Sequence, residues 1–169
     1  MTASCKWKEI NLCEKKLVCL VGIDGTGKTS HAIRLVSDLK SAGRKCKYVW
    51  LRLPHFVSLP FMAFCRIAGF TDRHVSREGK PISEHNYYRK PISLLWPWIQ
   101  LVDLVIFILA RIHVLMRFGY LVVCDRFVHD VLVDIMVDVG DKNLRRKQPG
   151  KLMLSLVPRG TVVCVLDIN

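Results

Sequence analysis

The chain has 169 residues, and 26 Lys and Arg against 14 Asp and Glu give it a net charge of +12. This length accommodates one globular domain over residues 1–169 rather than two, and the positive charge favours polyanionic ligands such as nucleotides. Seven scattered cysteines without a C-x-x-C pair argue against a disulfide scaffold and a zinc finger, and they are typical of a reduced, cytoplasmic protein.

A strand, a glycine-rich segment and a helix are predicted first. Residues 17–21 (L-V-C-L-V) form a continuous apolar run, which is typical of a strand buried on both faces of a sheet. After Thr29 the apolar residues recur at steps of three and four as far as Leu39, which predicts an amphipathic helix that ends near Gly43. The segment 22–29 between them has the sequence G-I-D-G-T-G-K-T.

This glycine-rich segment matches the pattern of a phosphate-binding loop. Glycines lack Cβ atoms, so the backbone can turn tightly and direct several N–H groups at one anion, while the following helix adds its positive dipole end. Lys28 is expected to reach the outer phosphates of ATP, and the Thr29 hydroxyl to ligate Mg²⁺. The alternative is a turn that only connects two elements. The predicted ATP-binding residues are Gly22, Gly25, Thr26, Gly27, Lys28, Thr29 and Ser30.

The middle of the chain is predicted to contain a strand, two helices and a long polar segment. Residues 47–51 are rich in aromatic and β-branched side chains, which predicts a short strand, and 57–68 has a helical pattern. Residues 71–91 are polar without a sustained period, so we expect a substrate-side loop or a disordered segment. The apolar residues 92–118 predict a long helix, broken near Pro97 and ended by Gly119.

This long apolar helix has to be compared with a membrane-spanning segment. Residues 94–110 are strongly apolar but contain Gln100 and Asp103. A spanning helix needs about 20 apolar residues, and an Asp at its centre costs about 2.5 to 3.5 kcal/mol. We therefore expect a buried helix and no membrane contact; a peripheral contact anchored by Trp96 and Trp98 is the alternative.

The last third of the chain adds two predicted strands. Residues 121–124 are apolar and lead to Asp125, a carboxylate at the end of a buried strand, where ligands of open α/β sheets bind. Arg126 adds a planar guanidinium suited to a phosphate. A helix over 128–139, a basic loop over 141–151, a helix over 151–157 and a strand over 161–167 follow. This alternation predicts an α/β fold, a P-loop NTPase-type parallel sheet of four strands with helices on both faces.

The loop G-x-D-G-x-G-K-T, combined with D-R-F after a buried strand, resembles the thymidylate kinase family over about residues 17–167. The resemblance implies a nucleoside monophosphate kinase fold and Mg²⁺-dependent phosphoryl transfer from ATP to a deoxynucleoside monophosphate, first of all dTMP to dTDP. By position, Asp24 resembles the acid that contacts the sugar 3′-hydroxyl, and Arg126 the arginine that holds the acceptor phosphate. Asp125 resembles the acid that is linked to Mg²⁺ or acts as a base. Arg52, in the sequence R-L-P, resembles a further acceptor-side residue.

The expected site follows from the loop and this resemblance together. The predicted catalytic residues are Lys28, Asp125 and Arg126, the substrate-binding residues are Asp24, Arg52 and Arg126, and the metal ligands are Thr29 and Asp125. Nucleotides are the expected partners, no nucleic acid is expected, and a homodimer stays open. For the base, Phe107 and Arg111 have the spacing of the family's contact pair, but Phe107 is expected in the core, with Gln100 or Asp103 as the alternative contact.

The family continues beyond its fourth strand with an arginine-bearing lid. We therefore expect this chain to be a C-terminally incomplete or shortened member of that family. Two other functions stay open as alternatives. The first is a nucleotide-binding P-loop protein with impaired catalysis, because a missing lid leaves the donor exposed to water. The second is a nucleic-acid- or membrane-associated ATPase, which the net charge of +12 favours.

Overall fold

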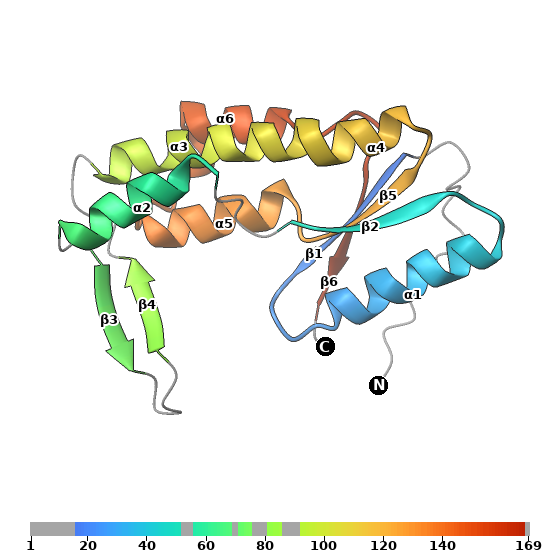
Figure 1. Cartoon of the computed structure of the whole chain (residues 1–169), viewed down its shortest axis with the longest axis horizontal. Coiled ribbons are helices and arrows are strands. Elements are labelled where there is room, and N and C mark those ends of the chain that lie inside the picture. The colour runs from blue at the N-terminus through green and yellow to red at the C-terminus, as the bar shows by residue number, and fades with distance from the viewer. Residues whose placement is uncertain (1–15, 52–55, 69–70, 76–80, 86–91, 168–169) are drawn as a thin grey trace.

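The computed structural model describes residues 16–51, 56–68, 71–75, 81–85 and 92–167. Its centre is a four-stranded sheet in the order β2-β5-β1-β6, in which all neighbouring strands are parallel (Figure 1). The strands are β1 (Leu17–Gly22), β2 (Cys46–Trp50), β5 (Leu121–Asp125) and β6 (Val162–Leu166). The α-helices are α1 (Lys28–Ser41), α2 (Ser58–Ile67), α3 (Ile92–Phe107), α4 (Val114–Arg117), α5 (Val128–Asp138) and α6 (Gln148–Ser155). The predicted α/β fold with a parallel sheet is confirmed.

Helices cover both faces of this sheet. Successive residues of a strand point to opposite faces, so the apolar strands present side chains that must be buried on both sides. On one face, Val18 and Leu20 of β1 pack with Ala32 and other apolar residues of α1. On the other face, Leu17 and Cys19 of β1 belong to a larger apolar cluster with residues of α3, α5 and α6. All the residues of β5 are buried, as a strand covered on both faces requires.

The long apolar helix continues past Pro97, so the predicted break there is wrong. Pro97 is buried in the second turn of α3, and the helix runs on to Phe107. A proline so near the start removes a single backbone hydrogen bond, and its ring packs in the core, which offsets the loss. The regular geometry changes instead at the π-helical segment η2 (Ile108–His113), which leads into α4.

Asp103 ties the middle of α3 to the start of α2. It is fully buried, and its two carboxylate oxygens accept the backbone N–H groups of Val57 (2.6 Å) and Ser58 (3.0 Å). These are donors that a helix start leaves without intrahelical partners. By length and composition the continuous helix Ile92–Arg117 could cross a membrane, and 33% of its most apolar stretch is buried inside the protein.

The polar segment 71–91 contains paired strands, which the sequence did not predict. β3 (Thr71–Val75) and β4 (Pro81–His85) are antiparallel, with Thr71 opposite His85. They form a separate two-stranded sheet at the end of the molecule that carries α2 (Figure 1). Two strands that pair only with each other do not require alternating apolar side chains, because the hydrogen bonds between them are made by backbone groups.

The region after α5 contains more helix than the predicted basic loop. A 3₁₀ turn, η3 (Leu144–Arg146), lies inside it, and Leu144 is buried. The next helix, α6, begins at Gln148 rather than at 151 and has Pro149 in its first turn. Proline is favoured at that position because the first N–H groups of a helix have no intrahelical acceptor.

Candidate functional site

The segment between β1 and α1 is a tight loop built on three glycines with positive φ. The φ angles are 148° at Gly22, 91° at Gly25 and 75° at Gly27, which is the N-cap of α1. A Cβ atom at Gly22 would lie 2.2 Å from the carbonyl oxygen of Leu166 in β6, so only glycine fits there. The N-cap makes no side-chain hydrogen bond to the first turn of α1. The backbone N–H groups of the loop and of the first turn of α1 therefore suit an anion bound over the loop.

Lys28 lies folded against the carbonyl groups of this loop. Its Nζ donates to the carbonyl oxygens of Gly22 (2.7 Å) and Ile23 (2.6 Å), and it lies 3.5 Å from Oδ1 of Asp24. The side chain is only 6% exposed, and a buried ammonium group requires such acceptors. The flexible stem of lysine lets the ammonium turn from these carbonyls towards an anion above the loop.

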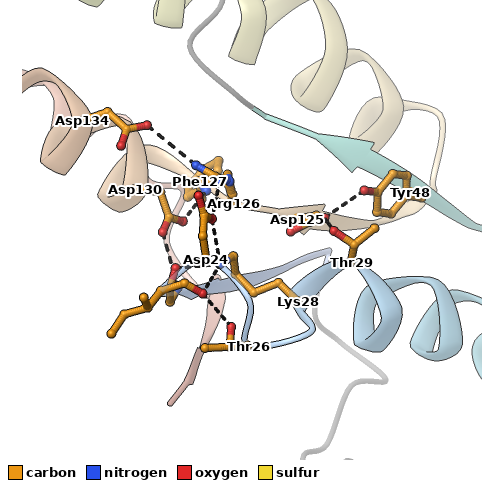
Figure 2. Close-up of polar contacts among 12 residues, drawn as sticks. Asp24, Thr26, Lys28, Thr29, Tyr48, Asp125, Arg126, Phe127, Asp130 and Asp134 are labelled. Atoms are coloured by element: carbon orange, nitrogen blue, oxygen red, sulfur yellow. Dashed lines mark hydrogen bonds and ion pairs between the residues drawn. The ribbon is translucent and has the colours of Figure 1, made fainter. Parts of the chain in front are cut away.

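A second polar group lies at the carboxyl end of β5. Oδ2 of Asp125 accepts hydrogen bonds from the hydroxyl groups of Thr29 (2.5 Å) and Tyr48 (2.9 Å), as Figure 2 shows. Burial, together with the hydrogen bond to Asp125, raises the pKa of Tyr48 to about 12. The phenol therefore stays protonated at neutral pH and holds the carboxylate in place.

Thr29 and Asp125 have the donor atoms that a Mg²⁺ ion requires. Hydroxyl and carboxylate oxygens are hard ligands, and Mg²⁺ often binds through one or two such groups. In the part of the chain that the structure describes, no cluster of three or more His, Cys, Asp or Glu side chains could hold a metal. Mg²⁺ commonly completes its coordination with water and phosphate oxygens.

A third polar group lies beside the loop, on the side that faces α5. Arg126 directly follows β5 with a φ of 65°, a left-handed conformation that costs free energy in non-glycine residues and clusters at functional sites. Its guanidinium donates to Asp24 in the loop and lies 3.8 Å from Oδ2 of Asp134 on α5 (Figure 2). The hydrogen bond from Arg126 holds the pKa of Asp24 below its usual value. Asp24 is 75% exposed, so an anionic ligand has access to this pair.

Asp130 joins the loop to α5, and the sequence analysis did not identify it. Its Oδ1 accepts the N–H of Gly22 (3.3 Å), and its Oδ2 accepts the N–H of Phe127 at the start of α5 (3.1 Å). One carboxylate therefore fixes the first glycine of the loop and caps a helix. The sequence signal that could have identified Asp130 is its position three residues after the N-cap residue Phe127, which is the position of the acidic residue in a capping box.

The other predicted residues have different positions. The Thr26 hydroxyl donates to a carbonyl within the loop (2.9 Å), and Ser30 is exposed in the first turn of α1. Phe107 packs against the core, as predicted, and Asp103 caps α2 rather than facing a ligand. Arg52 lies outside the described residues.

Neither a protein-family model nor a curated protein matches this chain. What the site can do must therefore be argued from its geometry. Thr29 and Asp125 meet on one side of the glycine loop, whereas Asp24 and Arg126 meet on the other, with Lys28 between them (Figure 2). Backbone donors, an ammonium, a carboxylate and a guanidinium around one loop can hold two anionic groups next to each other.

Proposed function

We propose that this protein binds ATP with Mg²⁺ at the loop 22–29 and transfers the γ-phosphoryl group to a deoxynucleoside monophosphate, first of all dTMP. The observation that carries the proposal is the presence of two polar pairs on one glycine loop, Thr29 with Asp125 and Asp24 with Arg126. A phosphoryl transferase needs two such places, because the donor and acceptor phosphates must approach in line.

The donor side is the loop itself with Lys28 and Thr29. Its backbone N–H groups and the start of α1 favour the phosphates of ATP, and Lys28 exchanges its loop carbonyl acceptors for phosphate oxygens. When bound, Mg²⁺ neutralises charge on the transferred phosphates. Asp125 and the Thr29 hydroxyl would hold that ion, and Tyr48 fixes the carboxylate.

The acceptor side is the pair of Asp24 and Arg126. A monophosphate dianion competes with the Asp24 carboxylate for the guanidinium, which can bind phosphate through two parallel hydrogen bonds. Asp24 is then free to accept a hydrogen bond from a sugar hydroxyl. This exchange links recognition of the phosphate to recognition of the sugar, so a ligand with both groups binds better than inorganic phosphate.

The reaction itself requires little covalent help from the protein. An oxygen of the acceptor phosphate attacks the γ-phosphorus, the bond between that phosphorus and the β–γ bridging oxygen breaks, and ADP leaves with the electron pair. Lys28 and the loop amides stabilise the negative charge on the donor phosphates. Arg126 reduces the repulsion between the two anions as they approach.

A coupled assay of ADP formation tests this proposal, with ATP, Mg²⁺ and a panel of nucleoside and deoxynucleoside monophosphates. We expect dTMP to raise ADP formation at least about tenfold above ATP alone, and Lys28→Ala to abolish it. Lys40→Ala is the matched control, because Lys40 is an exposed lysine on the same helix. ATP affinity that is unchanged in Lys28→Ala would overturn the proposed donor site.

Other outcomes of this assay, combined with thermal unfolding in the presence of ATP, support the alternatives. ATP that stabilises the fold without ADP formation with any monophosphate favours a nucleotide-binding protein without catalysis. ADP formation that depends on added DNA or on anionic vesicles, and not on a monophosphate, favours a nucleic-acid- or membrane-associated ATPase.

A further inference from the structure

The outer side of α2 is apolar and exposed along the helix, and it is called the α2 surface here. Its members are Phe56 (55% exposed), Leu59 (56%), Phe64 (63%) and Ile67 (88%). In the sequence 56–68, Arg66 is the one charged residue. A helix at the surface of a globular protein normally exposes a polar face, so an exposed apolar face marks an interaction surface.

The opposite side of α2 is fixed to α3, so the α2 surface cannot turn inwards. Asp103 of α3 accepts the backbone N–H groups of Val57 and Ser58 at the start of α2. Further along the helix, the ring of Phe61 stacks on that of Trp96, with 6.0 Å between the ring centroids. These contacts on one side of α2 leave the members of the α2 surface facing solvent.

A group of exposed basic residues lies where η3 meets α6, and it is called the basic corner here. Residues 142–159 contain six Lys and Arg and no Asp or Glu. Leu144 in this corner is buried, and a Cβ atom at Gly150 would lie 2.3 Å from the Leu144 carbonyl oxygen. η3 and α6 therefore pack closely, and the corner presents its charges from a fixed backbone. Its exposed basic members are Lys142, Arg145, Arg146 and Lys151.

Trp96 joins α2 to the helix that precedes the basic corner. Its Nε1 donates to Oδ2 of Asp138, the last residue of α5 (3.2 Å), and η3 follows α5 in the chain. Its ring contacts Phe61 of α2. Trp96 itself is 1% exposed, so it holds this part of the fold together and cannot serve as a membrane anchor. Figure 1 shows α2, the beginning of α3 and the end of α5 at one end of the molecule, with α1 at the other.

We propose that this end of the protein docks on an anionic lipid surface. The aromatic and aliphatic side chains of the α2 surface enter the boundary between headgroups and acyl chains, and the basic corner binds lipid phosphates. Both parts contribute, because a short apolar helix binds weakly and the attraction of Lys and Arg to anionic lipids adds to that binding. The docking is separate from the proposed phosphoryl transfer, since none of its residues belongs to the site at the glycine loop.

Charge and apolar surface together favour a lipid surface over other partners. A nucleic acid would bind the basic corner through its phosphates, but the α2 surface would stay in water. A second copy that bound through the same end would bring two basic corners together, and like charges across an interface oppose binding. An anionic bilayer offers negative charge and an apolar layer at the same place, and the net charge of +12 adds a general attraction.

Flotation of the full chain with vesicles, in the absence of nucleotide, tests the α2 surface. We expect the parent to bind vesicles of phosphatidylcholine with phosphatidylglycerol, and to bind phosphatidylcholine alone much more weakly. The double variant Phe64→Glu/Ile67→Glu should bind the mixed vesicles at least about 100-fold more weakly, because two apolar anchors are lost and two negative charges face the lipid. The matched control is Ile33→Glu/Val165→Glu, which adds the same charge at exposed residues of α1 and β6 (56% and 74% exposed). Circular dichroism melting shows that each variant is folded.

The double variant Arg145→Gln/Arg146→Gln tests the basic corner. Each basic residue near an anionic membrane contributes about fivefold to the affinity, so this variant should bind the mixed vesicles about 20-fold more weakly. The matched control is Arg34→Gln/Lys40→Gln, which removes the same charge from two exposed residues of α1 and should bind like the parent. Equal affinities of these two variants would overturn the role of the basic corner.

Insertion of α2 is measured with Phe64→Trp and with Val165→Trp as its control. Brominated lipids in the mixed vesicles should quench the new tryptophan in Phe64→Trp and not the one in Val165→Trp, with the parent as the background. A parent that does not float with the mixed vesicles, or equal quenching of the two variants, would overturn the proposal. Without vesicle binding, a dimeric parent that becomes monomeric in Phe64→Glu/Ile67→Glu would assign the α2 surface to a protein interface instead. DNA binding that is lost in Arg145→Gln/Arg146→Gln, again without vesicle binding, would assign the basic corner to nucleic acid.

Discussion

Asp130 is expected to stabilise the glycine loop and α5 through a single carboxylate. Asp130→Asn keeps the shape of the side chain and one carbonyl oxygen, so it can accept the N–H of Gly22 or that of Phe127, but not both. A hydrogen bond to a charged acceptor contributes about 1.5 to 3 kcal/mol. We therefore expect the free energy of unfolding to fall by about 2 kcal/mol in Asp130→Asn. In Asp130→Ala, which loses both bonds, it should fall by about 4 kcal/mol.

Thermal unfolding followed by circular dichroism measures this effect. A loss of 1 kcal/mol lowers the Tm of a chain of this size by about 2 to 4 °C, so Asp130→Ala should melt about 8 to 16 °C below the parent. Asp134→Asn is the matched control, because it makes the same change one turn further along α5. Asp134 is 40% exposed and lies 3.8 Å from Arg126, and an ion pair of this kind contributes less than about 1 kcal/mol.

A binding measurement shows whether the same carboxylate matters for the ligand. Below the melting temperature of each variant, ATP affinity should fall about tenfold in Asp130→Ala, because the released Gly22 amide loosens the loop at a cost of about 1.4 kcal/mol. Equal Tm values for Asp130→Ala and Asp134→Asn would refute the double role of Asp130. Unchanged ATP affinity would refute its link to the loop.

Three further predictions concern other parts of the site and its surroundings. Gly22→Ala should lower the free energy of unfolding, measured in urea, by more than about 3 kcal/mol, because the new Cβ would meet the Leu166 carbonyl oxygen. Gly25→Ala has open space around the new Cβ and should lose only about 1 to 2 kcal/mol to backbone strain. Thr29→Val should weaken Mg²⁺-dependent ATP binding about tenfold by calorimetry, and Thr29→Ser should not; equal affinities of the two variants would contradict the metal role. Burial raises the pKa of Asp138 to about 6 from 3.8. The folded state therefore binds more protons between these values, and stability should fall as the pH rises from about 4 to 6, by at most about 3 kcal/mol. Asp138→Asn should remove this fall. If the free energy of unfolding of both proteins changed with pH in the same way, the role of Asp138 would be disproved.

The order of the main elements could be predicted because each buried strand has a solid apolar run. Residues 17–21 and 121–124 are such runs, and they became β1 and the body of β5. Cys19 and Cys124 pack in the core of these strands, as small apolar residues do. The pairing of β3 with β4 could not be predicted from polar segments, because backbone hydrogen bonds leave no periodic trace in the side chains.

The candidate site was predictable where one short motif specifies the local chemistry. Lys28 and Thr29 follow the glycines directly, and Asp125 ends a buried strand, so their meeting follows from the geometry of parallel sheets. The contacts of Asp130 with the loop and of Tyr48 with β5 were missed because these partners are far away in sequence. Asp130 bonds to Gly22 and Tyr48 to Asp125, and neither contact is visible before the sheet order is known.

The position of β1 in the sheet has a consequence for how the protein is made. β1 pairs with β5 on one side and with β6 on the other, and both of these strands come from the last third of the chain. The glycine loop therefore leaves the ribosome early but gains its structural neighbours late, and pairings between distant segments form slowly. The surroundings of this loop can therefore form only after β6 has left the ribosome, however early the loop itself has emerged.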